Sequence, residues 1–314
     1  MKTYIIGHQK PDTDAVVAAM ALEDLFKQEP SFGYENPEAV IVDPLNPETS
    51  FVFEKFGVKA PRQITAEAIN EDDKIVLVDH NEESQHLNDL PVEQIAEIVD
   101  HHKPSFSFTQ PIFLNFKAWG STSTIVYFLM KREGVKPDQT LAGLMLAAIL
   151  SDTVGYKSAT TTDQDRKFGA ELAELAGIAD VEAFTLEIFK AKSDVSSLSD
   201  EEIVRNDYKV FGFARSTFID QLETVEQAEI LAEKKEALLA AMNKVKQAED
   251  VELLFVAITD ILQVNTKLLI LGDDEAAVAE KAFGGQVKNN ILNIGPKMSR
   301  KKEIAPAIEK ALEK

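Results

Sequence analysis

Histidines and aspartates cluster at three points in this chain, each directly after a short apolar run. The clusters are GHQKPDTDA at residues 7–15, DHN at residues 79–81 and DHH at residues 100–102. Together they contain four of the five histidines of the protein. Two carboxylates as close in sequence as Asp12 and Asp14 repel each other unless positive charge lies between them. The spacing therefore favours a site that binds metal cations.

The side chains able to hold such cations are two imidazoles and four carboxylates. They come from the three clusters and from the tripeptide SDT at residues 151–153: His8, Asp12, Asp14, Asp79, His101 and Asp152. The chain has no cysteine, so thiolate ligands are excluded. Mixed histidine and carboxylate ligands suit Mn²⁺, with Co²⁺, Zn²⁺ and Fe²⁺ as alternatives, whereas Mg²⁺ sites more often use oxygen alone. Two ions roughly 3.5–4 Å apart, with a bridging hydroxide as nucleophile, indicate phosphoryl chemistry.

Each cluster also has a local explanation. Capping or turn roles remain open for five aspartates: Asp12, Asp14, Asp79, Asp100 and Asp152. A basic run at residues 300–302 is compatible with the solvated start of a helix, although cations are unfavourable beside a helix N-terminus. These local roles do not explain why acids and histidines gather at the ends of successive apolar runs.

The elements that position these residues alternate between strand and helix in the first half of the chain. Strands are predicted at residues 3–6, 39–42, 74–78 and 97–99, and helices at 15–26, 122–132 and 141–150. This alternation predicts an α/β fold with a parallel sheet covered by helices. Ligands bind such sheets outside the carboxyl ends of the strands, and the three clusters follow strands there.

A polar, serine-rich stretch at residues 190–200 is predicted to link two domains. It separates an N-terminal metal-binding domain, residues 1–189, from a smaller C-terminal α/β domain, residues 201–314. In the second domain, strands are predicted at 208–213, 216–219, 251–258 and 267–271, one long helix at 225–247 and a final helix at 303–312. The ligands belong to the first domain and the basic run to the second, so we expect the active site in a cleft between them.

Composition and charge limit the partners of the protein. The chain has 314 residues, of which 45% are hydrophobic and 27% charged, as in globular proteins. Its net charge of −20 disfavours nucleic acid and anionic membranes as partners. The first residues lack the apolar core of a signal peptide, and the longest apolar run is too short to cross a bilayer. We therefore expect a cytoplasmic protein.

These motifs, in this order, resemble those of the manganese-dependent (family II) inorganic pyrophosphatases, which belong to the DHH phosphoesterase superfamily. The resemblance rests on GHxxPDxDA, VDHN, VDHH, ILSDT and SRKKEI, and it covers essentially the whole chain. The SRKKEI tail narrows it to the pyrophosphatase-like members. It implies hydrolysis of pyrophosphate to two orthophosphates by a homodimer formed through the N-terminal domains.

The resemblance also implies a role for each matched residue. One Mn²⁺ would be held by His8, Asp12 and Asp79, and a second by Asp14, Asp79, His101 and Asp152, with Asp79 bridging. The phosphate groups would be bound by His102, Lys209, Arg300 and Lys301, and a further Mg²⁺ would arrive with the substrate. His102 would also assist proton transfer, and His80 and Asn81 would lie beside the ligands or near the nucleophile. The remaining histidine, His86, is expected at the surface.

Three alternatives differ from this interpretation. A short-chain polyphosphatase shares the basic tail. A DHH-type oligonucleotide or dinucleotide phosphodiesterase usually carries a glycine-rich segment followed by a histidine, whereas Phe283–Gln286 contains a glycine pair without one. A non-catalytic binding protein would keep the ligands and lose the substrate cations, which are present here. The DHH cluster follows Asp79 too closely for the nucleotide-binding insertion of some relatives, so no regulation by that route is expected.

Overall fold

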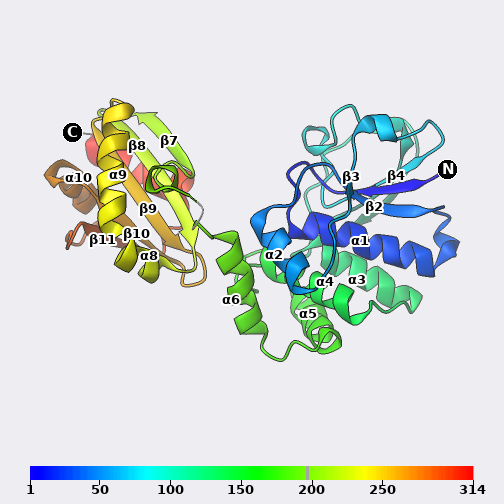
Figure 1. Cartoon of the computed structure of the whole chain (residues 1–314). Helices are drawn as coiled ribbons and strands as arrows, with labels where there is room; N and C mark the ends of the chain where they lie inside the picture. The colour runs from blue at the N-terminus through cyan, green and yellow to red at the C-terminus, as the bar shows by residue number, and fades with distance from the viewer. Residues whose placement is uncertain (196–197, 314) are drawn as a thin grey trace. The chain divides into compact units, whose positions relative to one another are not determined.

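The computed structural model describes residues 1–195 and 198–313. It divides into two compact units, Met1–Ala191 and Lys192–Lys314 (Figure 1). The expected linker at 190–200 includes residues 196 and 197, which lie outside the described residues. The start of that stretch is helical, because the last helix of the first unit continues to Lys192.

The first unit is built on a six-stranded sheet in the order β3-β2-β1-β4-β5-β6. Every neighbouring pair in this sheet is parallel. The strands are β1 (Thr3–Ile6), β2 (Pro37–Ile41), β3 (Arg62–Gln63), β4 (Lys74–Val78), β5 (Ile95–Asp100) and β6 (Phe113–Phe116). All four residues of β1 are buried, as expected for a parallel strand covered on both faces. The predicted parallel α/β sheet is confirmed.

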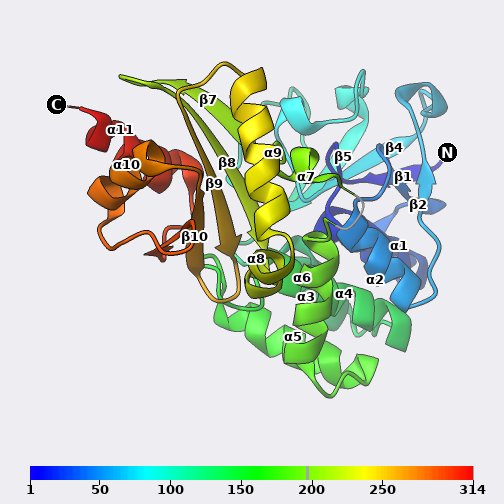
Figure 2. The same ribbon diagram turned by 60° about the vertical axis from the view of Figure 1, so that its left-hand side comes forward.

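Helices cover one face of this sheet, and loops cover the other (Figures 1 and 2). The helices are α1 (Thr13–Gln28), α2 (Pro47–Lys55), α3 (Thr122–Glu133), α4 (Gln139–Asp152), α5 (Asp163–Ala176) and α6 (Val181–Lys192). The apolar sequence LAGLMLAAIL makes α4 buried on all sides from Leu141 to Ser151. Because α4 is packed on all sides, the position of its last residue, Asp152, is fixed by the core.

The order of the strands creates a switch point beside β1. The chain moves from β1 to β2 and β3 on one side, and then to β4, β5 and β6 on the other. Ligands of open α/β sheets bind outside the carboxyl ends of the strands at such a point. His8, Asp79 and His101 each follow one of the three central strands, within two residues of its end.

The second unit has a mixed five-stranded sheet in the order β11-β10-β9-β8-β7. Its strands are β7 (Tyr208–Gly212), β8 (Ser216–Thr224), β9 (Leu253–Asp260), β10 (Asn265–Ile270) and β11 (Ile291–Gly295). Its helices are α7 (Asp200–Ile203), α8 (Gln227–Glu233), α9 (Lys235–Ala248), α10 (Asp273–Phe283) and α11 (Ala305–Leu312). One apolar cluster packs α9 on one face of the sheet, and a second packs α11 on the other.

Two predictions for this unit were wrong in detail. The long helix expected at 225–247 is two helices, α8 and α9, divided at Lys234, where φ is −108° and ψ is −6°. The final helix begins earlier, with a π-helical turn, Arg300–Ile304, that precedes α11. Charge periodicity continues across both junctions, so it did not reveal either change of backbone geometry.

Candidate metal centre

Asp79 lies at the centre of the cluster, directly after the last residue of β4. Its backbone is left-handed, with φ 61°, a region that aspartate tolerates better than most side chains. The carboxylate is buried, and its two oxygens face different histidines. Oδ2 lies 3.7 Å from Nε2 of His8, and Oδ1 lies 3.4 Å from Nε2 of His101. Asp79 therefore connects the two sets of ligands predicted from the sequence.

The first set brings together His8, Asp12 and Asp79 within 4.8 Å of one another. Nδ1 of His8 lies 2.8 Å from the carbonyl oxygen of Gln9. A carbonyl only accepts, so Nδ1 carries the proton and Nε2 offers a lone pair to a cation. Asp12 divides its oxygens, because Oδ1 accepts from the backbone N–H of Ala15 as the N-cap of α1 and Oδ2 lies 3.7 Å from His8. Capping and metal binding are thus compatible in one residue.

The second set brings together Asp14, Asp79, His101 and Asp152 within the same limit. His101 has the same orientation as His8, since its Nδ1 lies 3.0 Å from the carbonyl oxygen of Trp119. Its Nε2 lies 3.6 Å from Oδ2 of Asp152, the last residue of α4. The distances from Nε2 of His101 to the carboxylates of Asp79 and Asp152, 3.4 and 3.6 Å, are longer than a typical hydrogen bond, and two ligands of one ion are separated in this way.

The N-terminus of α3 fixes two acids of this second set, Asp14 and Asp79, a contribution that the sequence analysis missed. Asp14 accepts from the hydroxyl of Ser121 at 3.0 Å and from the backbone N–H groups of Thr122 and Ser123 at 2.6 and 2.9 Å. The Thr122 hydroxyl donates to Oδ1 of Asp79 at 2.8 Å. The signal was visible as the run STST before an apolar helix, which is typical of an N-cap.

The electrostatics of the cluster favour a bound cation. Burial raises the pKa of Asp14 to about 6, and the charge of Asp79 adds to this effect. Burial also raises the pKa of Asp152 well above its usual value, together with the charges of Asp14 and Asp12. Nε2 of His101 is buried without a hydrogen-bond partner. Four converging carboxylates and an unpartnered imidazole nitrogen fit divalent manganese.

His102 is oriented by a carboxylate rather than by a backbone carbonyl. Its Nδ1 lies 2.9 Å from Oδ1 of Asp100 and 3.8 Å from Oδ1 of Asp79. Asp79, His101 and His102 form a third group whose ligand atoms are close enough to hold a metal ion. Nδ1 of His102 is nevertheless closer to Asp100 than to Asp79, so we assign it to the hydrogen bond with Asp100. The hydrogen bond to Asp100 raises the pKa of His102, and partial burial works against it. Nε2 remains for a substrate.

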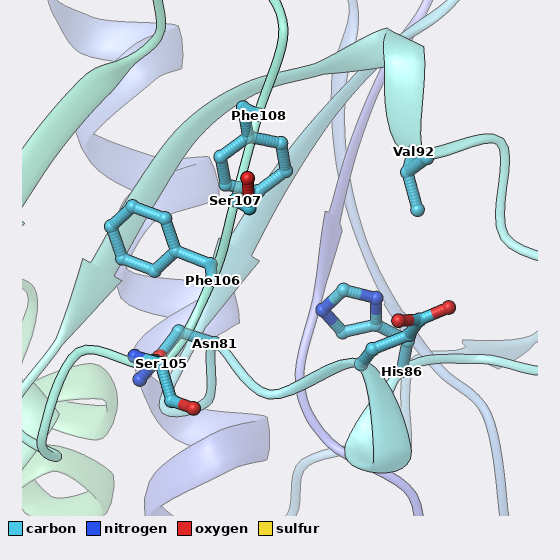
Figure 3. Close-up of a pocket in the computed structure, with 8 residues that line it drawn as sticks. Asn81, His86, Val92, Ser105, Phe106, Ser107 and Phe108 are labelled. Carbon is cyan, nitrogen blue, oxygen red and sulfur yellow. Dashed lines mark hydrogen bonds between the residues drawn. The ribbon is translucent and has the colours of Figure 1, made fainter.

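Asn81 uses its side chain to hold the loop after β5. Its amide donates to Oδ2 of Asp100 at 2.6 Å and to the carbonyl of Lys103 at 3.2 Å, and its oxygen accepts from the N–H of Ser105 at 2.5 Å. Its hydrogen bonds therefore act on the residues that orient His102. Asn81 also lines a separate pocket of about 540 Å³ with Phe106 (Figure 3).

The expected surface position of His86 was wrong. Only 6% of the residue is exposed, and its ring meets that of His80 edge to face at 5.3 Å between centroids. Both ring nitrogens of His86 lack a partner, and the ring lines the pocket of Figure 3. The polar loop packs its apolar members, Leu87 and Leu90, against the sheet, so the segment that carries His86 lies against the protein rather than in solvent.

The candidate substrate cations occur in the second unit. Lys209 is exposed in β7, and Arg300 and Lys301 open the π-helical turn. Ser299 and Glu303 stabilise that turn, since the Ser299 hydroxyl accepts from Lys302 N–H and the Glu303 carboxylate accepts from Ser299 N–H at 3.2 Å. The nearby Glu303 carboxylate offsets the unfavourable position of cations at a helix start.

Comparison with known proteins gives consistent matches across the chain. Residues 2–149 match the DHH family, N-terminal domain, and residues 186–311 match the DHHA2 domain. A manganese-dependent inorganic pyrophosphatase from Methanocaldococcus jannaschii is 38% identical, with 98% of each chain covered. One from Methanothrix thermoacetophila is 37% identical, covering 99% of this chain and 98% of the relative.

Solved structures show the same likeness. A Methanococcus jannaschii protein described as a family II inorganic pyrophosphatase superposes with a TM-score of 0.62 at 36% identity, covering 99% of this chain and 100% of that protein. An exopolyphosphatase-related protein from Bacteroides fragilis has a TM-score of 0.51 at 17% identity, covering 99% and 92%, and shares the fold. No helix in the described parts of the chain is long and apolar enough to span a bilayer.

Proposed function

The chain belongs to the manganese-dependent inorganic pyrophosphatases of the DHH family, and on this premise we propose that it hydrolyses pyrophosphate to two orthophosphates at the cluster around Asp79. The observation that carries this proposal is the division of the Asp79 carboxylate between two ligand sets. A carboxylate shared in this way would hold two divalent cations close together, the arrangement that two-metal phosphoryl-transfer sites use.

The protein ligands form two sets, of three and four residues, that share Asp79. His8, Asp12 and Asp79 would hold one Mn²⁺, and Asp14, Asp79, His101 and Asp152 would hold another, with Co²⁺ as a substitute. When bound, manganese stabilises charge on the phosphate oxygens and lowers the pKa of water so that it can act as a nucleophile. A further Mg²⁺ arrives with pyrophosphate, because phosphate-bound Mg²⁺ needs few protein ligands.

The remaining residues orient the substrate and move a proton. Lys209, Arg300 and Lys301 bind the phosphate oxygens and neutralise their charge. His102, held through Nδ1 by Asp100, presents Nε2 to the substrate and transfers a proton to the departing phosphate. Asn81 keeps Asp100 in place for this role. The net charge of −20 makes these local cations necessary for an anionic substrate and disfavours nucleic acid.

The protein also forms a homodimer through its N-terminal units and acts in the cytoplasm. The free edge of the first sheet supports the dimer, because β6 pairs only with β5 among the described strands and exposes Phe113 and Leu114. An edge strand with unpaired backbone groups and apolar side chains is a ready contact for a second chain.

The test begins with protein stripped of metal by chelation. Mn²⁺ and Mg²⁺ are then restored, and phosphate release is measured from pyrophosphate, tripolyphosphate and a short dinucleotide. Rapid, Mn²⁺-dependent release from pyrophosphate alone is expected. Preference for tripolyphosphate would keep the metal centre and identify a polyphosphatase, and preference for the dinucleotide would identify a phosphodiesterase. No release from any of the three would refute the hydrolase proposal.

A further inference from the structure

Arg300 is held by an acidic residue that no role described so far explains. Nη2 of Arg300 donates to Oδ1 of Asp207 at 2.8 Å. Only 16% of the arginine side chain is exposed, whereas 62% of the aspartate side chain is exposed. An ordinary surface ion pair of this kind contributes little to stability. The Arg300–Asp207 pair lies beside the candidate substrate cations of the second unit, which favours a role in substrate binding rather than in stability.

Asp207 lies two residues before Lys209, where the chain enters β7. Its side chain therefore connects this segment with the SRKKEI turn, which is more than 90 residues further along the chain. Both segments carry cations of the proposed phosphate site. The carboxylate of Asp207 thus ties the guanidinium of Arg300 to the start of the strand that carries Lys209.

Two side chains of β8, those of Asp220 and Gln221, hold the backbones of Asp207 and Arg300. Oδ1 of Asp220, which is fully buried, accepts from the backbone N–H of Asp207 at 2.9 Å. The side chain of the next residue, Gln221, accepts from the backbone N–H of Arg300 at 2.8 Å and donates to the carbonyl of Met298 at 2.9 Å. The strand β8 therefore holds Asp207 and Arg300 by their backbones, while Asp207 holds the guanidinium.

The same cluster leaves two groups of opposite charge unsatisfied. Oδ2 of Asp220 and Nη1 of Arg300 are both buried without a hydrogen-bond partner. Burial raises the pKa of Asp220 to about 7, and the charge of Arg300 is among the influences that oppose this shift. The charge of Arg300 therefore acts on two carboxylates, because it pairs directly with Asp207 and opposes the raised pKa of Asp220.

We propose that Asp207, with its backbone anchored by Asp220, is a positioning residue that presets Arg300 for pyrophosphate binding. A free arginine side chain loses rotamer entropy when it binds a phosphate, and the pair with Asp207 incurs that loss before the substrate arrives. This inference rests on the proposed function, since it assumes that Arg300 binds the substrate.

The test compares Asp207→Ala and Asp207→Asn with the wild type in the Mn²⁺-loaded full chain. Asp207→Ala is expected to raise KM for pyrophosphate about tenfold with a smaller change in kcat, because a charge-assisted hydrogen bond is removed. Asp207→Asn keeps an acceptor oxygen and should lie between. The matched control is Asp274→Asn, because Asp274 pairs with Arg215 at the same 2.8 Å and is similarly exposed. It should leave KM unchanged.

A double-mutant cycle identifies the route of the effect. In an Arg300→Ala background, Asp207→Ala should change KM by less than about twofold, because it acts through the missing arginine. Bound manganese should be the same in all variants. An unchanged KM for Asp207→Ala, or an equal effect with and without Arg300, would overturn this inference alone. Loss of the proposed function would appear separately, as a wild-type enzyme without pyrophosphate hydrolysis.

Discussion

A single carboxylate, that of Asp79, determines whether the two ligand sets act as one centre. Its left-handed backbone directs one oxygen to His8 and the other to His101. The carbonyls of Gln9 and Trp119 set both imidazoles so that Nε2 faces the acids. Metal binding at this site therefore depends on backbone geometry as much as on the identity of the ligands.

Asp79→Asn should remove metal from both sets. Asparagine tolerates the left-handed backbone, so the change removes charge with little strain. We expect the affinity for Mn²⁺ to fall by more than about 100-fold at both positions, measured as bound metal after dialysis. Asp89→Asn is the control, because Asp89 has a similar φ of 58° and is exposed. One Mn²⁺ still bound by Asp79→Asn would show that Asp79 is not shared.

Asp220 should make the stability of the protein depend on pH. Its pKa of about 7 in the folded state compares with an ordinary value of 3.8. Between these values the unfolded chain binds fewer protons than the folded chain, so stability falls as pH rises. Asp220→Asn abolishes this titration. Its gain in Tm over the wild type should be several degrees larger at a pH of about 8 than at about 5, by calorimetry. An equal difference at both values would contradict the assignment.

At the scale of elements, the N-terminus of α3 holds Asp14, and the loop before α3 packs closely against the end of α4. A Cβ at Gly120 would lie 2.7 Å from Cγ2 of Thr153 and 2.8 Å from Oδ2 of Asp165. The backbone N–H of Gly120 donates to the same Asp165 oxygen at 2.9 Å. A larger residue must displace the N-terminus of α3, and with it the donors to Asp14.

Gly120→Ala is therefore expected to lower stability by about 1–3 kcal/mol and to weaken manganese binding at the second set. The control is Gly212→Ala, where the added Cβ meets no atom within 4 Å. Denaturant unfolding and metal titration measure the two effects. Unchanged manganese affinity in a destabilised Gly120→Ala protein would show that this helix end contributes to packing but does not position the metal ligands.

The elements were more predictable than the contacts between them. Apolar runs indicated β1, β4 and β5, and their parallel order placed the three clusters at one edge. The break at Lys234 was not predictable, because charged residues continue across it. The burial of His86 was not predictable either, because its loop packs Leu87 and Leu90 against residues of distant strands. The run STST indicated that Ser121 caps a helix, but the contacts of Ser121 with Asp14 and of Asp100 with His102 appear only once the chain brings these residues together.

At the scale of the whole molecule, the edge strand β6 governs the proposed dimer. Phe113 is 71% exposed and Leu114 is 49% exposed, on a strand that ends a six-stranded sheet. Natural proteins protect such edges with charge or by pairing them with another strand. The two apolar side chains on β6 leave pairing with a second copy as the simplest protection.

Leu114→Lys should therefore weaken the dimer, because a lysine on the edge strand opposes strand pairing. We expect the dimer Kd to rise more than about tenfold, measured by light scattering across a dilution series. Leu175→Lys is the control, because Leu175 is a partly exposed leucine on α5, away from the sheet edge. Manganese content should stay the same in both, since every ligand belongs to one chain. A dimer that persists unchanged with Leu114→Lys would place the interface away from β6, and a monomeric wild type would refute the dimer itself.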